Sequence, residues 1–146
     1  MKLLRGVILF TLAICILASS LISCEGGIKR DEAKELINGF LSKIEVGDYG
    51  GAEELMHPDK RIDIEEFISD FEIKNGVDFS DGIEILKYTN FESSYFESSV
   101  NGSRYKLNML TKIGKSEFTV SAEAVKNKNG YGIYSFILNS VNYSSI

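Results

Sequence analysis

Residues 103–126 read SRYKLNMLTKIGKSEFTVSAEAVK, two runs in which apolar and polar side chains alternate on either side of Gly114-Lys115. Successive side chains of a strand point to opposite faces of a sheet, so each run predicts a strand with one apolar face. We expect antiparallel strands over residues 103–113 and 116–126, joined by a tight turn. Their apolar faces consist of Tyr105, Leu107, Met109 and Ile113 in the first run and of Phe118, Val120, Ala122 and Ala124 in the second.

Turn signals on both sides of this pair add one strand at each end. Asn101-Gly102 and Asn129-Gly130 are typical of hairpin turns, and β-branched and aromatic residues dominate the flanking segments 83–96 and 131–140. The sequence therefore predicts a four-stranded meander, with a bulge in the serine-rich segment 92–99. Alternation in the last run predicts a strand that is apolar on both sides, with Ile133 and Ile137 on one face and Tyr134, Phe136 and Leu138 on the other.

The segment before the strands has helical periodicity. Apolar residues recur at three- and four-residue steps over residues 31–46, which predicts a long helix that ends at Gly47. Asp48 is a suitable N-cap for a shorter helix that ends before Pro58, and Asp63 is a suitable N-cap for a third. The expected fold class is α+β, with N-terminal helices packed on one face of a curved four-stranded antiparallel sheet.

The first 24 residues indicate where the protein is located. Two basic residues precede an uncharged apolar segment that is too short to span a membrane, and Leu21-Ile22-Ser23-Cys24 follows it. This arrangement resembles the lipobox of bacterial lipoproteins, in which the cysteine is lipidated and the chain is cleaved before it. The resemblance implies a signal peptide over residues 1–23, a lipidated cysteine and short tether over residues 24–30, and a single domain over residues 31–146. We expect acyl chains on Cys24 to hold the domain on the extracytoplasmic face of the cell membrane.

Charge and cysteine content argue against several classes of function. Removing residues 1–23 takes away two basic and no acidic residues, so the formal net charge changes from −5 to −7. An acidic domain without a basic cluster is not expected to bind nucleic acid, or to dock on anionic lipid through its charge. Cys15 leaves with the signal peptide and the Cys24 thiol is used for the lipid, so no thiol remains for a disulfide, for catalysis or for a metal site.

A family resemblance covers most of residues 31–140. Residues 40–52, FLSKIEVGDYGGA, are similar to the opening of the nuclear transport factor 2-like (cystatin-like) domains found in small bacterial lipoproteins. Residues 129–136, NGYGIYSF, are similar to that family's last strand, in which a tryptophan usually stands at the position of Tyr131. The resemblance implies a sheet wrapped around the long helix as a cone with a pocket at its wide end, and a fold that often forms homodimers. It implies no particular activity.

Few side chains suit catalysis or metal binding. His57 is the only histidine, and its position in Met56-His57-Pro58 favours capping of the preceding helix, whose last carbonyls an imidazole can bond. Some enzymes of the superfamily use a His-Asp pair, but the candidates Asp48 and Asp59 are both close to His57 in sequence. The acidic clusters lack the ligand spacing of a calcium loop, so we expect no metal and no cofactor.

Aromatic side chains on the predicted sheet are the main candidates for a binding site. We expect a non-catalytic, membrane-anchored accessory domain that binds a small apolar ligand or an envelope protein, with a homodimer as a further possibility for the open sheet face. The alternative is a small hydrolase or isomerase that uses His57 and a carboxylate. The candidate pocket or partner face consists of Tyr88, Phe91, Tyr95, Tyr105, Tyr134 and Phe136.

Overall fold

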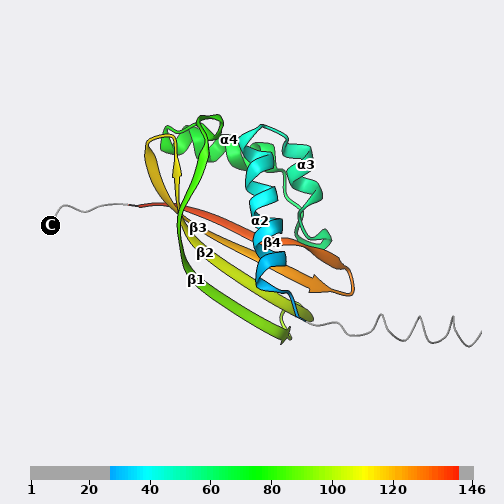
Figure 1. The fold of residues 1–146 in the computed structure, drawn as a ribbon. Helices are drawn as coiled ribbons and strands as arrows, with labels where there is room; N and C mark the ends of the chain where they lie inside the picture. The colour runs from blue at the N-terminus through cyan, green and yellow to red at the C-terminus, as the bar shows by residue number, and fades with distance from the viewer. Residues whose placement is uncertain (1–26, 142–146) are drawn as a thin grey trace, which may run out of the picture.

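Helices and a four-stranded antiparallel sheet form two layers in the computed structural model, which describes residues 27–141 (Figure 1). This arrangement confirms the α+β class, with helices followed by a curved antiparallel meander. The segment predicted to be a signal peptide, Cys24 and the first part of the predicted tether lie outside the described residues, and no helix in the described part is long and apolar enough to cross a membrane. The elements are α2 (Arg30–Glu45), α3 (Tyr49–Glu54), the 3-10 turn η1 (Pro58–Lys60), α4 (Ile64–Asn75), the 3-10 turn η2 (Phe79–Asp81), β1 (Ile83–Glu97), β2 (Gly102–Ile113), β3 (Ser116–Asn127) and β4 (Gly130–Ser140).

The α-helices begin and end close to the residues that local sequence signals indicate. The Asp48 side chain caps α3 by accepting a hydrogen bond from the Gly51 N–H at 3.0 Å, and Asp63 caps α4 by accepting from the Glu66 N–H at 2.9 Å. Gly76 ends α4 in the left-handed conformation, at φ 64°. Leu36 of the predicted apolar stripe of α2 is partly buried against the core, and the rest of the stripe is buried, namely Ala33, Ile37, Phe40, Leu41 and Ile44.

The strands pair in sequence order, each antiparallel to the next. β2 and β3 pair along their whole length without a shift of register, and the alternate side chains predicted to be apolar and inward-facing are buried. β1 is irregular, with three register shifts, the last of them between Ser94 and Glu97. That shift confirms the bulge expected in the serine-rich segment. Bulges bend and twist the strand that carries them, which adds to the curvature of the sheet.

A bulge in β4 changes which of its side chains face the core. The register with β3 shifts at Tyr134, an extra residue between Ile133 and Ser135. Ile133 and Phe136 are therefore both buried, while Ile137 is exposed. The alternation that we expected for this strand was wrong, because one extra residue reverses the facing of every side chain that follows it.

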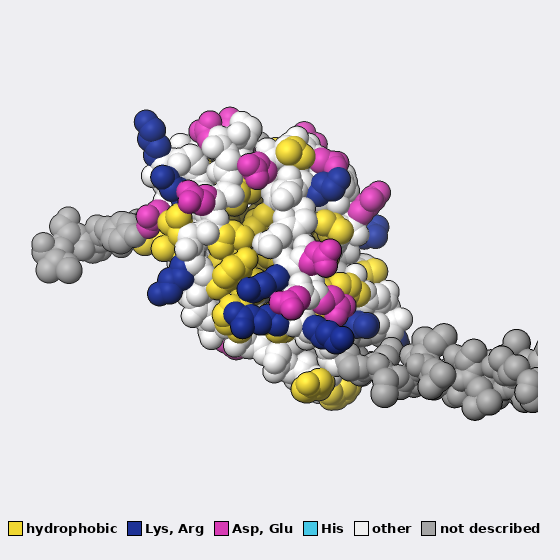
Figure 2. All heavy atoms as spheres, viewed as in Figure 1, with side chains coloured by type: hydrophobic (Ala, Val, Ile, Leu, Met, Phe, Trp, Pro, Cys, Tyr) yellow, Lys and Arg dark blue, Asp and Glu magenta, His cyan; other side chains and the backbone are white. Residues whose placement is uncertain are grey.

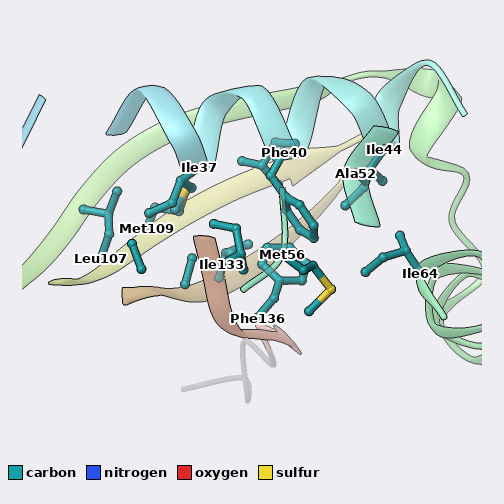
Figure 3. Packing of buried hydrophobic residues seen from close by; sticks show 14 of the residues in the cluster. Ile37, Phe40, Ile44, Ala52, Met56, Ile64, Leu107, Met109, Ile133 and Phe136 are labelled. Atoms are coloured by element: carbon teal, nitrogen blue, oxygen red, sulfur yellow. The ribbon is translucent and has the colours of Figure 1, made fainter. Parts of the chain in front are cut away.

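The core lies between α2 and the face of the sheet that curves around it (Figures 1 and 3). Phe40 from α2 meets Phe136 from β4 edge to face, with ring centroids 5.0 Å apart. The space inside the cone is thus filled by buried apolar side chains. Other fully buried side chains in this space include Ile37, Ile44, Leu107, Met109 and Ile133.

The free edge of β4 is covered by the linker between α3 and η1. The Ile133 N–H donates to the Leu55 carbonyl at 2.9 Å, and the His57 N–H donates to the Ile133 carbonyl at 2.8 Å. Gly132 makes this close approach possible, because a Cβ atom there would lie 2.6 Å from the His57 backbone nitrogen. The linker protects an edge strand and fixes His57 beside the sheet.

Candidate functional site

His57 lies at the centre of a polar cluster where the α3–η1 linker meets the turn between β3 and β4. Its Nδ1 atom accepts a hydrogen bond from the Asp59 N–H at 3.1 Å, so this nitrogen carries no proton. Nε2 therefore carries the proton and donates to Asn127 Oδ1 at 3.1 Å. The Tyr134 ring packs against the imidazole at 69°, with centroids 5.5 Å apart.

Asn127 and Asp59 extend the cluster towards solvent. Asn127 Nδ2 donates to the Val100 carbonyl at 3.0 Å, and Oδ1 also accepts from the Asn129 N–H at 2.8 Å. Asn129 Nδ2 donates to both carboxylate oxygens of Asp59 at 3.0 Å. Hydrogen bonds from the Asn129 amide, and to a lesser degree from Asn127, hold the pKa of the Asp59 carboxyl below its usual range against the opposing effect of burial.

His57 is buried, and its hydrogen bonds are all made within the domain. Both ring nitrogens are bonded within the protein and the residue exposes 0% of its surface, so the imidazole presents no nitrogen to solvent. The expected cap on the preceding helix was wrong. His57 caps the following turn, η1, because Pro58 has no N–H and the Asp59 N–H is the first donor there. The Asp59 carboxylate lies 3.6 Å from Nδ1, but this nitrogen already accepts the Asp59 N–H and has no proton to donate to the carboxylate.

Three of the six candidate aromatic residues belong to the packing of the domain. Tyr105 and Phe136 are buried in the core and expose 4% and 8% of their surface. Tyr134 is the bulge residue of β4 at the edge of the polar cluster, and the Lys60 ammonium lies 5.3 Å from its ring centroid. Tyr105 and Phe136 are therefore core residues, whereas Tyr134 lies beside the polar cluster around His57.

Cations from α2 cover the next two candidates, Tyr88 and Phe91 on β1. The Arg30 guanidinium lies 3.9 Å from the Phe91 ring centroid, and the Lys34 ammonium lies 4.4 Å from that of Tyr88. The two rings are also neighbours, with centroids 6.0 Å apart. Cation–π contacts of this kind hold the first turns of α2 over β1.

Tyr95 differs from the other five candidates because it is exposed. Tyr95 and Phe96 expose 83% and 66% of their surface at the bulge near the end of β1. A regular half-buried strand would turn one of two adjacent side chains inward, so the sequence pattern gave no reason to single out Phe96. The Tyr95 ring lies against the start of the described chain, since a Cβ atom on Gly27 would come within 2.7 Å of Tyr95 Cδ1.

Two open hollows lie near these features. One, of about 370 Å³, is at the end of the sheet next to Tyr95 and Phe96, and Lys126, Asn127 and Lys128 also line it. The other, of about 420 Å³, is on the face of the sheet that points away from α2. Its lining includes Lys106, Asn108, Thr119, Ser121 and Ile137.

Two further observations bear on the chemistry of the chain. Within residues 27–141, no group of three or more His, Cys, Asp or Glu side chains is placed to hold a metal ion. In comparisons with known proteins, no family model, curated protein or solved structure matches the chain.

Proposed function

We propose that this protein is a lipoprotein, anchored through Cys24 on the extracytoplasmic side of a bacterial membrane, whose domain binds a protein partner. The observation that carries the binding part of the proposal is the outer face of the sheet. α2 covers the opposite face (Figure 1), and the outward-pointing side chains of β2, β3 and β4 are left accessible. The lipobox-like residues 21–24 carry the anchoring part.

The composition of the outer sheet face supports a protein partner. Asn108 of β2 pairs with Ser121 of β3, Leu110 pairs with Thr119, and the half-exposed Ile137 of β4 adjoins them. Surfaces that combine a few apolar anchors with polar hydrogen-bonding groups are typical of interfaces between proteins that also exist apart. Because these groups stand on paired strands, they lose little freedom when a partner binds.

The other two functions receive less support from the same geometry. A site for a small apolar ligand is expected to be an enclosed apolar cavity, whereas Phe40 and Phe136 meet inside the cone and the hollows are open and partly polar. A hydrolase or isomerase that used His57 would need an accessible imidazole nitrogen, and both nitrogens are bonded within the protein. Protein binding is therefore the function that we favour.

The anchor can be tested by metabolic labelling of the full-length chain with an alkyne analogue of palmitate in its own host. We expect label on the unsubstituted protein and on the C15A variant, and none on the C24A variant. An unsubstituted protein that carries no label, or a C24A variant that keeps it, would contradict the anchor.

Partner binding can be tested by placing a photo-crosslinking amino acid at position 137 of the full-length chain in the intact envelope. We expect a protein adduct from Ile137 and none from a matched position, Ile73 on α4, which exposes 80% of its surface. The substitution K106E beside Ile137 should lower the yield several-fold, while K115E in the β2–β3 turn should not. Equal yields from positions 137 and 73 would contradict the proposal, and an adduct of twice the chain's mass would identify the partner as a second copy.

A further inference from the structure

We propose that the end of the sheet that carries Tyr95 and Phe96 rests in the headgroup region of the membrane and orients the domain on the lipid surface. The inference rests on the proposed anchoring through Cys24. We call the surface formed by Tyr95, Phe96, Lys126 and Lys128 the anchor-side patch. Its four residues line one hollow at the end of the sheet.

The two aromatic side chains of the anchor-side patch are both exposed, although they are adjacent in a strand. Tyr95 and Phe96 are adjacent, yet both side chains point into solvent because the register of β1 shifts between Ser94 and Glu97. β1 is the first strand of the sheet, with a partner strand on one side only. Removing apolar ring surface from water is favourable, so two adjacent exposed rings offer a partner apolar area to cover.

The tether places this patch next to the membrane. Gly27 lies against the Tyr95 ring, and only two residues, Glu25 and Gly26, lie between Gly27 and Cys24. The three residue-to-residue steps from Cys24 to Gly27 span at most about 11 Å when the chain is fully extended. The acyl chains on Cys24 would enter the hydrocarbon core, and the interfacial layer above it is about 5–8 Å thick on each side. Tyr95 is therefore within reach of that layer whatever path the tether takes.

The chemistry of the anchor-side patch fits a bilayer interface. Tyrosine rings are enriched at headgroup depth, where the ring is in an apolar environment and the hydroxyl is hydrated. Lys126 and Lys128 line the same hollow as the two rings, and an anionic lipid surface attracts basic residues that lie close to it. Figure 2 shows hydrophobic side chains projecting at the lower end of the molecule, where Figure 1 places the start of α2 and the turn between β1 and β2.

Charge at the other end of the domain favours the same orientation. Glu65, Glu66 and Asp70 are exposed on α4, which lies at the opposite end of the molecule from the β1–β2 turn (Figure 1). An anionic lipid surface repels these carboxylates, which turns α4 away from the membrane while the lysines of the patch face it. The domain as a whole is acidic, so the aromatic rings and the tether supply the attraction.

Single tryptophans provide a direct test, because the chain contains none. The variants F96W and I73W replace side chains of similar exposure, on the patch and on α4. Each full-length, lipidated variant is reconstituted into phosphatidylcholine vesicles, with and without phosphatidylglycerol, that contain brominated acyl chains as quenchers. We expect emission from position 96 to fall about twofold and to shift to shorter wavelength, and emission from position 73 to stay unchanged.

The outcomes separate failure of the patch from failure of the anchor. Intact mass measurement of the same samples reports whether Cys24 carries acyl chains. An acylated protein whose position 96 is not quenched would overturn the patch and leave the anchor standing, and the same holds if positions 96 and 73 are quenched equally. A chain without acyl groups would overturn the anchor and the patch together. A protein adduct at position 96 in the envelope, without quenching in vesicles, would assign the patch to a protein partner instead.

The unsubstituted protein gives a second measurement that does not depend on tryptophan. Hydrogen–deuterium exchange compares the acylated chain in vesicles with the C24A variant, which carries no acyl groups, free in buffer. We expect amides of the β1–β2 turn, residues 98–101, to exchange several-fold more slowly in the acylated chain. Amides of the α2–α3 turn at Gly47 should not change. No difference in residues 98–101 would overturn the proposal.

Discussion

The Nε2 atom of His57 lies 3.1 Å from the Oδ1 atom of Asn127, and this hydrogen bond joins two segments that are 70 residues apart in the chain. The same asparagine donates to the Val100 carbonyl, so it connects the α3–η1 linker, the turn after β1 and the end of β3. The network is partly buried, and a missing member leaves its partners without a hydrogen bond where the dielectric constant is lower than in water. The network therefore specifies one position for the linker on the sheet.

The substitution N127A should destabilise the fold strongly. It removes the acceptor of the His57 Nε2–H and the donor to the Val100 carbonyl, and an unsatisfied buried polar group costs about 1–3 kcal/mol. We expect the free energy of unfolding in urea to fall by about 2–3 kcal/mol. N139A removes an exposed amide from the other end of β4 and should cost less than about 0.5 kcal/mol. Equal losses in the two variants would contradict the structural role of Asn127.

Gly132 should tolerate no larger side chain. An alanine Cβ at this position would lie 2.6 Å from the His57 nitrogen and 2.8 Å from the Leu55 carbonyl oxygen, and backbone atoms cannot move aside as a flexible side chain can. We expect G132A to lower the free energy of unfolding by about 2–3 kcal/mol through this overpacking. G50A in α3 is the matched control, because a Cβ there meets no atom within 4 Å and should stabilise the helix by up to about 1 kcal/mol. A stable G132A variant would mean that the linker does not pair with β4.

Most elements could be predicted because their signals are local. The strand expected over residues 103–113 spans Gly102–Ile113, since unbroken alternation between two hairpin turns leaves little choice of register. The apolar stripe predicted a helix over residues 31–46, and the observed helix α2 spans Arg30–Glu45. β4 could not be predicted in the same way, because nothing in its own sequence marks Tyr134 as the extra residue of a bulge. That position depends on how the strand fits β3.

The candidate site was harder to predict than the fold. The contact of His57 with Asn127 depends on the α3–η1 linker pairing with β4, which is a relationship between distant segments that no local pattern encodes. The six candidate residues are all aromatic and all lie on strands, yet Tyr105 is buried in the core and Tyr95 is exposed to solvent. Residue type alone does not indicate which side of a twisted strand is covered.

Acid should weaken the polar cluster through Asp59. The pKa of Asp59 is lower in the folded chain than the ordinary value of about 3.9. Its contribution to stability is therefore complete above about pH 5 and is lost as the pH falls through about 3.9 towards the folded pKa. The substitution D59N removes this charge, and we expect it to lower stability at pH 7 and to make stability less dependent on pH below about pH 4. Asp48 and Asp78, whose pKa values are also lowered, should keep part of the acid dependence. Urea unfolding at pH 7 and below about pH 4 measures this effect, and D70N on the exposed face of α4 is the control. If the loss of stability in acid were the same in D59N as in the unsubstituted protein, the prediction would be refuted.

Tyr131 should stabilise the contact between β4 and the first turn of α2, and its loss should appear most clearly in alkali. Its hydroxyl donates to the Glu32 carbonyl at 3.2 Å, and burial, followed by the charges of Glu32 and Glu35, raises its pKa above the ordinary value of about 10. A raised pKa means that the contribution to stability is complete below pH 10 and is lost as the pH rises towards the folded pKa. Y131F should therefore cost about 1 kcal/mol at pH 7, from the lost hydrogen bond, and should lose less further stability than the unsubstituted protein above about pH 10. Y95F, which changes an exposed hydroxyl, should match the unsubstituted protein in both measurements, and a Y131F variant that does the same would show that the hydroxyl contributes nothing to this contact.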